Sequence, residues 1–215
     1  GDHRDLHLSL RRQRQMCIRD SRFTTHIVTA RGRGLNNRAN DWLLAIGMTA
    51  SAIGNLMHRE LLSLGFQRVV FSSGPPQAFK FKDFNTLHIP LTQELLKPAL
   101  LASGSIPFLM GGINLRQASA PGQYWDGGII DYHFDFGNQV GEGMILYPHF
   151  DTNVIKGWFD KRIPWRITAT KLLSKTVVVA PSQHYLKQLP GGKIPDRKDF
   201  SRSVSYTHLT LPTKA

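Results

Sequence analysis

One stretch decides the interpretation of this 215-residue chain: Tyr124-Trp125-Asp126-Gly127-Gly128-Ile129-Ile130-Asp131. It places a carboxylate directly before two glycines, between an aromatic pair and an apolar pair. Because glycine has no Cβ, the backbone after Asp126 can turn tightly and approach a neighbouring loop closely. An Asp-Gly pair is also a common turn signal. Taken alone, the stretch therefore indicates only a tight turn beside a carboxylate.

A second stretch lies about twenty residues upstream: Leu100-Leu101-Ala102-Ser103-Gly104-Ser105-Ile106-Pro107-Phe108. With the Asp-Gly-Gly stretch at this spacing, it resembles the C-terminal catalytic region of the patatin-like phospholipases. The resemblance covers roughly residues 22 to 147. It implies a three-layer α/β sandwich with a mostly parallel central sheet, whose N-terminal part is missing from this chain. It also implies a serine acyl hydrolase that cleaves lipid or phospholipid ester bonds and needs no cofactor.

The resemblance gives roles to five residues. Asp126 matches the family's catalytic base, and Gly127, Gly128, Ser103 and Pro107 would shape the site around it. A serine hydroxyl holds its proton tightly, so a positioned base must remove that proton during attack on the acyl carbon. An aspartate can serve if it is held against the hydroxyl and its pKa is tuned by its surroundings.

The departures from the family pattern concern the nucleophile. No G-x-S-x-G elbow occurs between Gly1 and Ala215, and the family's glycine-rich oxyanion loop is missing as well. Ser103 and Ser105 do not lie in such an elbow, and Ser103 is expected to hydrogen-bond a helix carbonyl instead. Where the family often has Asp-Asn followed by proline, this chain has Asp131-Tyr132-His133-Phe134. We therefore expect the chain as given to be inactive, with its nucleophile outside the sequence.

Both ends of the chain resemble translated sequencing-adapter sequence, in the runs 11–21 and 204–213. We therefore expect residues 1–21 and 204–215 to be non-native and residues 22–203 to be a partial acyl hydrolase domain. The whole chain has a net charge of +12, and residues 22–203 retain 21 Lys and Arg against 12 Asp and Glu, or +9. The single cysteine, Cys17, lies in the first adapter-like segment, which excludes disulfides and thiolate sites from the expected domain.

The apolar pattern predicts alternating strands and helices, which is typical of an α/β fold. A helix is expected from Asn40 or Asp41 to about Leu64, ended by Gly65, and another from Thr92 to Ala102. Strands are expected at 23–29, 68–71, 86–91, 144–147 and 176–180, and further helices at 164–174 and 181–188. The last two strands are continuous apolar runs, which suit a sheet covered on both faces.

Two alternatives stay open. The tripeptide His-Phe-Asp occurs twice, at 133–135 and 149–151, and on strands each pair could present an imidazole and a carboxylate to one metal ion of a hydrolase. The clustered charge at Arg31 to Gly34 and Lys187 to Arg202 could instead bind an anionic membrane without catalysis. The same charge could bind nucleic acid, but we expect no nucleic-acid partner, because no aromatic residues are interleaved and no such motif occurs. In a lipid hydrolase this charge would favour peripheral contact with an anionic membrane.

Overall fold

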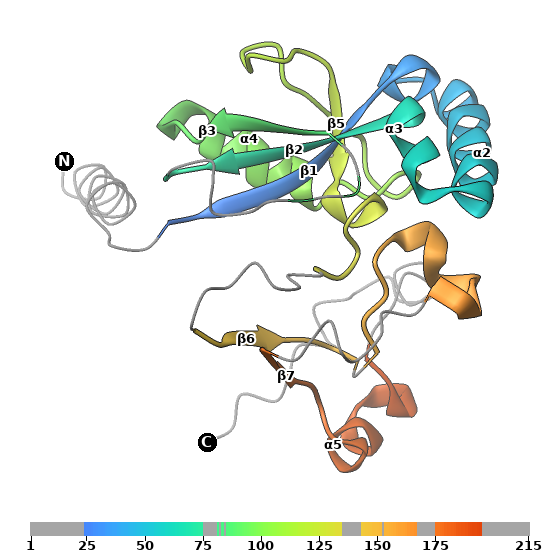
Figure 1. The fold of residues 1–215 in the computed structure, drawn as a ribbon, viewed down its shortest axis with the longest axis vertical. Coiled ribbons are helices and arrows are strands. Elements are labelled where there is room, and N and C mark those ends of the chain that lie inside the picture. Colours follow the sequence, from blue (N-terminus) through green and yellow to red (C-terminus); the bar gives the residue numbers. More distant parts are fainter. Residues whose placement is uncertain are drawn as a thin grey trace.

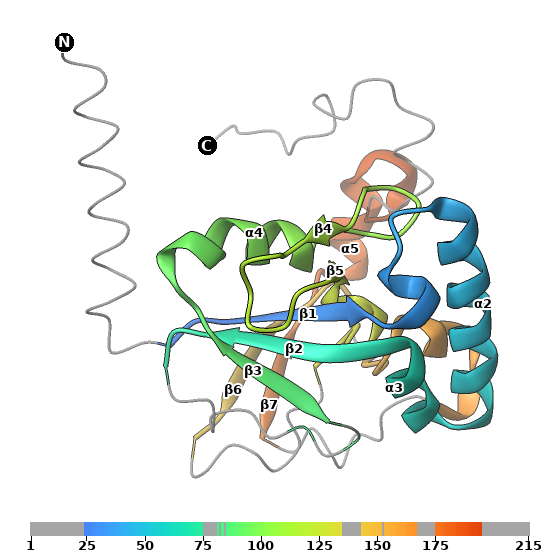
Figure 2. The ribbon, with the colours of Figure 1, turned by 90° about the horizontal axis from the view of Figure 1, so that it is seen from above.

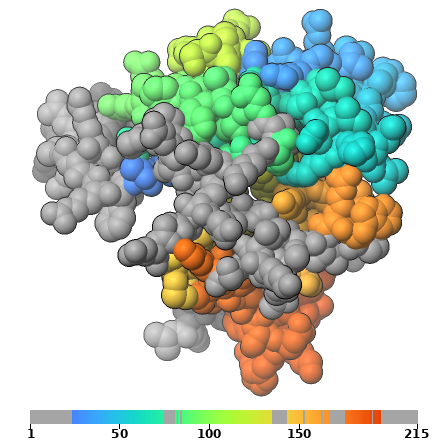
Figure 3. All heavy atoms as spheres, in the orientation of Figure 1, coloured from blue at the N-terminus to red at the C-terminus, as the bar shows by residue number. Residues whose placement is uncertain are grey.

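A computed structural model of the chain describes residues 24–74, 81, 83, 85–134, 143–151, 153–166 and 175–194. Seven strands are described in this part, in two sheets. The first sheet has five strands in the order β3-β2-β1-β5-β4, and the second pairs β6 with β7. In Figure 1 the five-stranded sheet and its helices form the upper part of the molecule, and β6, β7 and α5 lie below them. The same division is visible on the surface in Figure 3.

The strands of the first sheet are β1 (His26–Gly32), β2 (Phe66–Ser72), β3 (Thr86–Pro90), β4 (Ile113–Asn114) and β5 (Gln123–Asp126). Those of the second are β6 (Ile145–Pro148) and β7 (Thr176–Val179). The α-helices are α2 (Asp41–Met57), α3 (Leu62–Gly65), α4 (Gln93–Ser103) and α5 (Gln183–Gln188). Short 3-10 segments are η1 (Gly34–Asn37), η2 (Arg59–Leu61), η4 (Gly127–Ile129), η5 (Trp158–Arg162), η6 (Pro164–Arg166) and η8 (Pro190–Gly192).

The chain is a mixed α/β protein, but the expectation of a mostly parallel sheet is wrong for the described five-stranded sheet. Only β2 and β3 run parallel there, and the other three neighbouring pairs are antiparallel. After β1 the chain passes through α2 and α3 and returns to the same end of the sheet. Gly32 is paired with Phe66, and the Arg33 N–H donates to the Gly65 carbonyl at 2.9 Å. A strand-helix-strand pattern in the sequence is compatible with an antiparallel return as well as with a parallel crossover, so it did not determine the direction of β2.

Helix boundaries follow from side-chain caps. The Asn40 side chain accepts hydrogen bonds from the N–H groups of Trp42 and Leu43, and the Thr92 hydroxyl accepts one from Leu95. Both caps satisfy N–H groups that lack a partner in the first turn, as the sequence predicted. The first helix ends earlier than predicted, at Met57, because the next residue, His58, is extended. Of the helix predicted at 164–174, only η6 is described, and 167–174 lie outside the described residues.

The core has two apolar clusters, one on each face of the sheet, because successive strand residues point to opposite faces. Helix α4 packs on one face, where Ala99 and Ala102 are fully buried. Figure 2 shows α4 along this face and α2 at the end of the sheet. The opposite cluster joins Leu44 and Met48 of α2 to Trp125 of β5. Helix α4 therefore packs on one face of β5 and helix α2 on the other, which holds in place the strand that ends at Asp126.

The second sheet differs from its prediction. Strands β6 and β7 form as expected, but their side chains alternate between half-buried and exposed. Leu146 is 69% exposed and Val179 is 53% exposed. The predicted burial on both faces is therefore wrong for these two strands. Within the described residues, no helix combines the length and the apolarity that crossing a bilayer requires.

Candidate functional site

Asp126 is the last residue of β5 and lies beside β1, where it is paired with Thr29. Its N–H donates to the Ser105 carbonyl at 2.9 Å. One carboxylate oxygen, Oδ1, accepts the Gly128 N–H at 2.8 Å and caps η4. The residue is half-buried. The carboxylate is thus held at a strand end by its own turn, on a backbone fixed between two core clusters.

The two glycines allow this turn for different reasons. A Cβ on Gly127 would lie 2.4 Å from the Val28 carbonyl oxygen, so only glycine fits against β1 at this point. A Cβ on Gly128 would lie 3.2 Å from Oδ1 of Asp126, a tight but smaller conflict. The predicted close approach is confirmed at Gly127, although the neighbour is a strand rather than a loop.

Ser103, Ser105 and Pro107 form the end of α4 and the turn after it. The Ser103 hydroxyl donates to the Leu100 carbonyl at 2.8 Å, which confirms its predicted bond to a helix carbonyl. The Ser105 hydroxyl donates in the same way to Leu101 at 2.8 Å, and Ser105 is 2% exposed. Both hydroxyl groups thus donate to backbone carbonyl oxygens of α4. Pro107 is buried.

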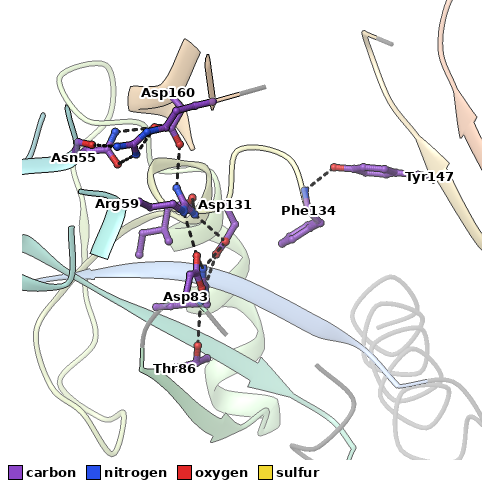
Figure 4. A network of polar contacts seen from close by, with 11 residues as sticks. Asn55, Arg59, Asp83, Thr86, Asp131, Phe134, Tyr147 and Asp160 are labelled. Carbon is purple, nitrogen blue, oxygen red and sulfur yellow. Dashed lines mark hydrogen bonds and ion pairs between the residues drawn. The ribbon is translucent and has the colours of Figure 1, made fainter. Parts of the chain in front are cut away.

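A buried ion network lies next to this turn and was missed by the sequence analysis (Figure 4). Arg68 of β2 has no exposed surface and donates to the Asp131 carboxylate from Nε at 2.6 Å and from Nη2 at 2.7 Å. It also donates to both oxygens of Asp83, at 2.7 and 3.0 Å. The guanidinium of Arg59 lies 3.8 Å from Asp131 and 3.1 Å from Asp83. The available signal was an arginine directly before the apolar run 69–71 of β2.

The network sets the protonation of its acids. Burial alone would raise the pKa of Asp83, but the hydrogen bonds and charges of Arg68 and Arg59 lower that pKa to about 2. Burial raises the pKa of Asp131, and the attraction of the same two arginines opposes that rise. Arginine stays charged in proteins, so the network balances two cations against two carboxylates. Both oxygens of Asp131 therefore accept hydrogen bonds from Arg68 inside the network. Asp126 lies five residues earlier, at the end of β5.

A third acid, Asp160, extends the network towards the C-terminal segments. Asp160 is 2% exposed and accepts from Asn55 at 2.8 Å, from Arg59 at 3.1 Å and from Arg166 at 3.3 Å. The Arg166 Nη2 also donates to the Asn55 carbonyl at 2.6 Å. These contacts tie α2 to η5 and η6 and place the segment after Val154 against the first sheet's helices (Figure 4).

The His-Phe-Asp pairs do not form the predicted strand geometry. His133 lies in a bend and His149 follows β6, and Asp135 lies outside the described residues. The two imidazole rings meet edge to face with centroids 4.0 Å apart. The Nδ1 atom of His133 accepts the Ile155 N–H at 2.7 Å, and that of His149 accepts the N–H of Asp151. Among the described residues, no group of three or more His, Cys, Asp or Glu could hold a metal ion.

The histidine pair is nonetheless electrostatically unusual. Burial, followed by the nearby charges of His149 and Lys161, lowers the pKa of His133 to about 4. A neutral His133 ring that accepts at Nδ1 carries its proton on Nε2. That tautomer has no lone pair on Nε2 to offer a metal. The metal-site alternative therefore loses its geometric premise in the described part of the chain.

The structure brings together a serine and a histidine that the sequence analysis did not connect. His26 and Ser72 are paired across β1 and β2, and the His26 Nδ1 lies 2.8 Å from the Ser72 hydroxyl. Burial, and the nearby charge of His88, lower the pKa of His26. Ser72 is 6% exposed. No sequence motif marks this pair, because its members are 46 residues apart and meet only through strand pairing.

The basic segments are partly engaged in structure. Arg31 donates to the Pro121 carbonyl at 2.8 Å and to Gln67 at 2.9 Å, and Arg33 donates to the Ser63 carbonyl at 2.9 Å. These bonds give two of the clustered arginines a role in holding loops. The second basic stretch continues past residue 194, outside the described residues.

Comparison of the chain with protein-family models, with curated proteins and with solved structures finds no match.

Proposed function

We propose that this chain is the base-carrying part of a patatin-like serine acyl hydrolase with the family's three-layer fold, which cleaves lipid or phospholipid esters. Asp126 is the base, and the nucleophilic serine belongs to sequence outside this chain. One observation above all supports the proposal. The Asp126 carboxylate stands at the end of a central strand and is oriented by the Gly128 N–H at 2.8 Å, while Gly127 is pressed against β1.

The reaction assigns one proton transfer to Asp126. As the serine oxygen attacks the ester carbonyl, its proton passes to the carboxylate and a tetrahedral intermediate forms. The intermediate collapses to an acyl-enzyme, and the leaving alcohol takes the proton from Asp126. Water then attacks the acyl-enzyme with Asp126 again as base, which releases the fatty acid and restores the serine. Over the cycle one ester and one water give one acid and one alcohol.

The fixed backbone around Asp126 suits this role. A general base acts when its heavy atom lies about 2.6–3.2 Å from the atom that carries the proton, or reaches it through one water, so a base on a mobile loop would lose rate. The bonds from Ser105 and to Gly128 fix both the backbone and one carboxylate oxygen. The small residues of 102–105 let the end of α4 lie directly against β5. Gly127, Gly128, Ser103 and Pro107 support the base in this way and do not react.

The same proposal predicts that the 215-residue chain is inactive by itself. Loss of the nucleophile costs serine hydrolases on the order of a million-fold in turnover. Loss of one oxyanion donor, taken by itself, raises the activation free energy by roughly 3 kcal/mol, and this cost does not simply add to that of the missing nucleophile. The pair of Ser72 and His26 is the rival source of a nucleophile within the chain, because the two side chains are within hydrogen-bonding distance.

The test compares three proteins on a short-chain p-nitrophenyl ester and on phospholipid vesicles. The first is the chain itself, the second its Ser72→Ala variant, and the third a longer gene product that includes an upstream G-x-S-x-G. We expect saturable hydrolysis only from the third. Asp126→Asn should remove its activity, whereas Asp41→Asn, which neutralises an exposed acid of α2, should not. Hydrolysis by the chain alone that is lost with Ser72→Ala would replace the proposal with a Ser-His mechanism.

A further inference from the structure

The segment that leads from α4 towards β4 exposes an unusual amount of apolar surface. Five large side chains within residues 100–110 are about half exposed, and we call them the apolar shoulder. They are Leu100 (53%), Leu101 (50%), Phe108 (55%), Leu109 (44%) and Met110 (52%). Scattered exposed apolar residues need no explanation, but a cluster of this kind marks an interaction surface.

Backbone geometry holds Phe108 in this exposed position. Its φ is 66°, and it is the one non-glycine residue with positive φ in the part of the chain that the structure describes. That conformation is unfavourable for a bulky residue. It is maintained by a turn in which the Ile106 carbonyl accepts the N–H groups of Leu109 at 3.2 Å and Met110 at 2.9 Å. Strained positions of this kind cluster at ligand-contacting sites.

The apolar shoulder is anchored to the candidate base. Ser105 precedes the turn directly, and its carbonyl accepts the Asp126 N–H at 2.9 Å. Pro107, immediately before Phe108, is buried. The turn therefore starts at Ser105, which contacts Asp126, and its apolar residues 108–110 are exposed to solvent.

Two cations flank the apolar shoulder in the sequence. Lys97 precedes it and Arg116 follows it, and the nearest acidic residues are Glu94, at the start of α4, and Asp126. Both cations are exposed. Lys97 precedes Leu100 and Leu101 by three and four residues on α4, so the three lie on the same face of the helix. Apolar residues flanked by cations suit the boundary between anionic head groups and acyl chains.

We propose that the apolar shoulder is the surface through which this protein docks on an anionic phospholipid bilayer. Phe108, Leu109 and Met110 enter the boundary between head groups and acyl chains, and Lys97 and Arg116 face the lipid phosphates. The choice of a lipid partner rests on the proposed function, in which the substrate is a lipid ester. Docking at this point brings Asp126 next to the lipid surface.

A second exposed apolar surface supplies the matched control. Helix α2 exposes Ile53 (59%), Leu56 (55%) and Met57 (69%), a comparable set of large side chains. The nearest charged residues in sequence are of both signs, Arg59 and Glu60. In addition, Ile53, Leu56 and Met57 adopt ordinary helical geometry, without the positive φ of Phe108.

The experiment measures binding of the full chain to equimolar phosphatidylcholine and phosphatidylglycerol vesicles by co-sedimentation. Phe108→Gly, Leu109→Ser and Met110→Ser together should raise the lipid concentration for half-binding at least about tenfold, because the apolar contact is lost. Glycine tolerates the positive φ at 108, so the variant should still fold, which its thermal unfolding checks. Ile53→Ser, Leu56→Ser and Met57→Ser should leave binding within about twofold, which is under 0.5 kcal/mol. Lys97→Glu with Arg116→Glu should remove the preference for anionic over purely phosphatidylcholine vesicles.

The proposal is overturned if the wild-type chain does not sediment with vesicles, or if the shoulder variant binds as well as the wild type. It is also overturned if the shoulder variant changes the oligomeric state and not lipid binding, because a second copy then covers the surface. Vesicle binding needs no catalysis, so its failure is distinguishable from failure of the proposed function. Asp126-dependent hydrolysis of a soluble ester by a longer gene product would survive a negative binding result.

Discussion

Replacing Arg68 by methionine is the most informative test of what holds this fold together. Arg68 has no exposed surface and makes two charged hydrogen bonds to Asp131 and two to Asp83. Methionine keeps much of the side-chain volume but removes the guanidinium. Asp131 would then retain Arg59, whose nearest nitrogen is 3.8 Å away. Removal of one partner of a buried ion pair costs about 3–5 kcal/mol, because the other charge stays buried without compensation.

Such a loss is measurable because small domains are stable by only about 5–15 kcal/mol. With a urea slope of roughly 2 kcal/mol per molar, the midpoint should fall by about 1.5–2.5 M. Equilibrium unfolding followed by tryptophan fluorescence, to which the buried Trp125 contributes, reports it. Arg116→Met, on the exposed surface, is the control and should change stability by less than about 0.5 kcal/mol.

A double variant separates the ion pair from simple packing. In Arg68→Met with Asp131→Leu, neither charge of the closest pair remains, so the loss should be smaller than for Arg68→Met alone. A stability loss below about 1 kcal/mol for Arg68→Met would refute the idea that the buried charge of Asp131 depends on Arg68 for its compensation. A double variant as damaged as the sum of its singles would refute the coupling.

Two further perturbations test the turn and the histidine pair. Gly127→Ala should destabilise the fold by about 2 kcal/mol or more, because its Cβ would overlap the Val28 carbonyl. The control Gly104→Ala has open space around its Cβ and should change stability by less than about 0.5 kcal/mol. Thermal unfolding compares the two variants, and equal losses of stability would contradict the close approach of Gly127 to β1. His133 should make stability pH-dependent, because its pKa in the folded protein is about 4, below the ordinary histidine value of 6.5. The unfolded chain therefore binds more protons, and stability should fall as the pH drops from about 6.5 to 4. Urea midpoints across this range should show a slope that His133→Gln reduces but does not remove, because the pKa of His26 is also lowered; an unchanged slope would contradict the burial of a neutral His133 ring.

Local signals in the sequence predicted much of the secondary structure. Asn40 and Thr92 were identifiable as caps because their side chains act on residues two or three positions away. The strand ending at Ser72 was recognisable from its apolar run. These features depend on contacts within a few residues, which is the range that a sequence pattern reports.

The strand directions and the ion network could not be predicted in the same way. The antiparallel pairing of β1 and β2 depends on where a 33-residue excursion, from Arg33 to Gly65, returns to the sheet. The network joins Arg68 to Asp131 across 63 positions, and Asn55 to Asp160 across 105. The bond between His26 and Ser72 arises from strand register alone. Each of these is a consequence of tertiary pairing, for which a single sequence has no local signal.

In the candidate site, too, the residues of a local motif could be predicted, whereas the contacts made through the fold could not. Asp126 and its glycines were identified from a short motif, and their geometry gives that motif a physical basis in the contact of Gly127 with β1. The Ser105 carbonyl, which receives the Asp126 N–H, could be placed near it only through the fold. The strand premise of the metal alternative does not hold for the described residues, because neither His133 nor His149 lies in a strand, and Asp135 lies outside the described residues.

The most direct test of Asp126 as the base is the rate at which a fluorophosphonate probe phosphonylates the nucleophilic serine, with fluoride as the leaving group. It is measured on a longer gene product that includes an upstream G-x-S-x-G, as wild type and as Asp126→Asn. Asparagine keeps the oxygen that accepts the Gly128 N–H but cannot take the proton. We predict labelling slowed by about 10²–10⁴-fold, with unchanged thermal unfolding. Labelling at the wild-type rate by a folded Asp126→Asn protein would contradict the proposal.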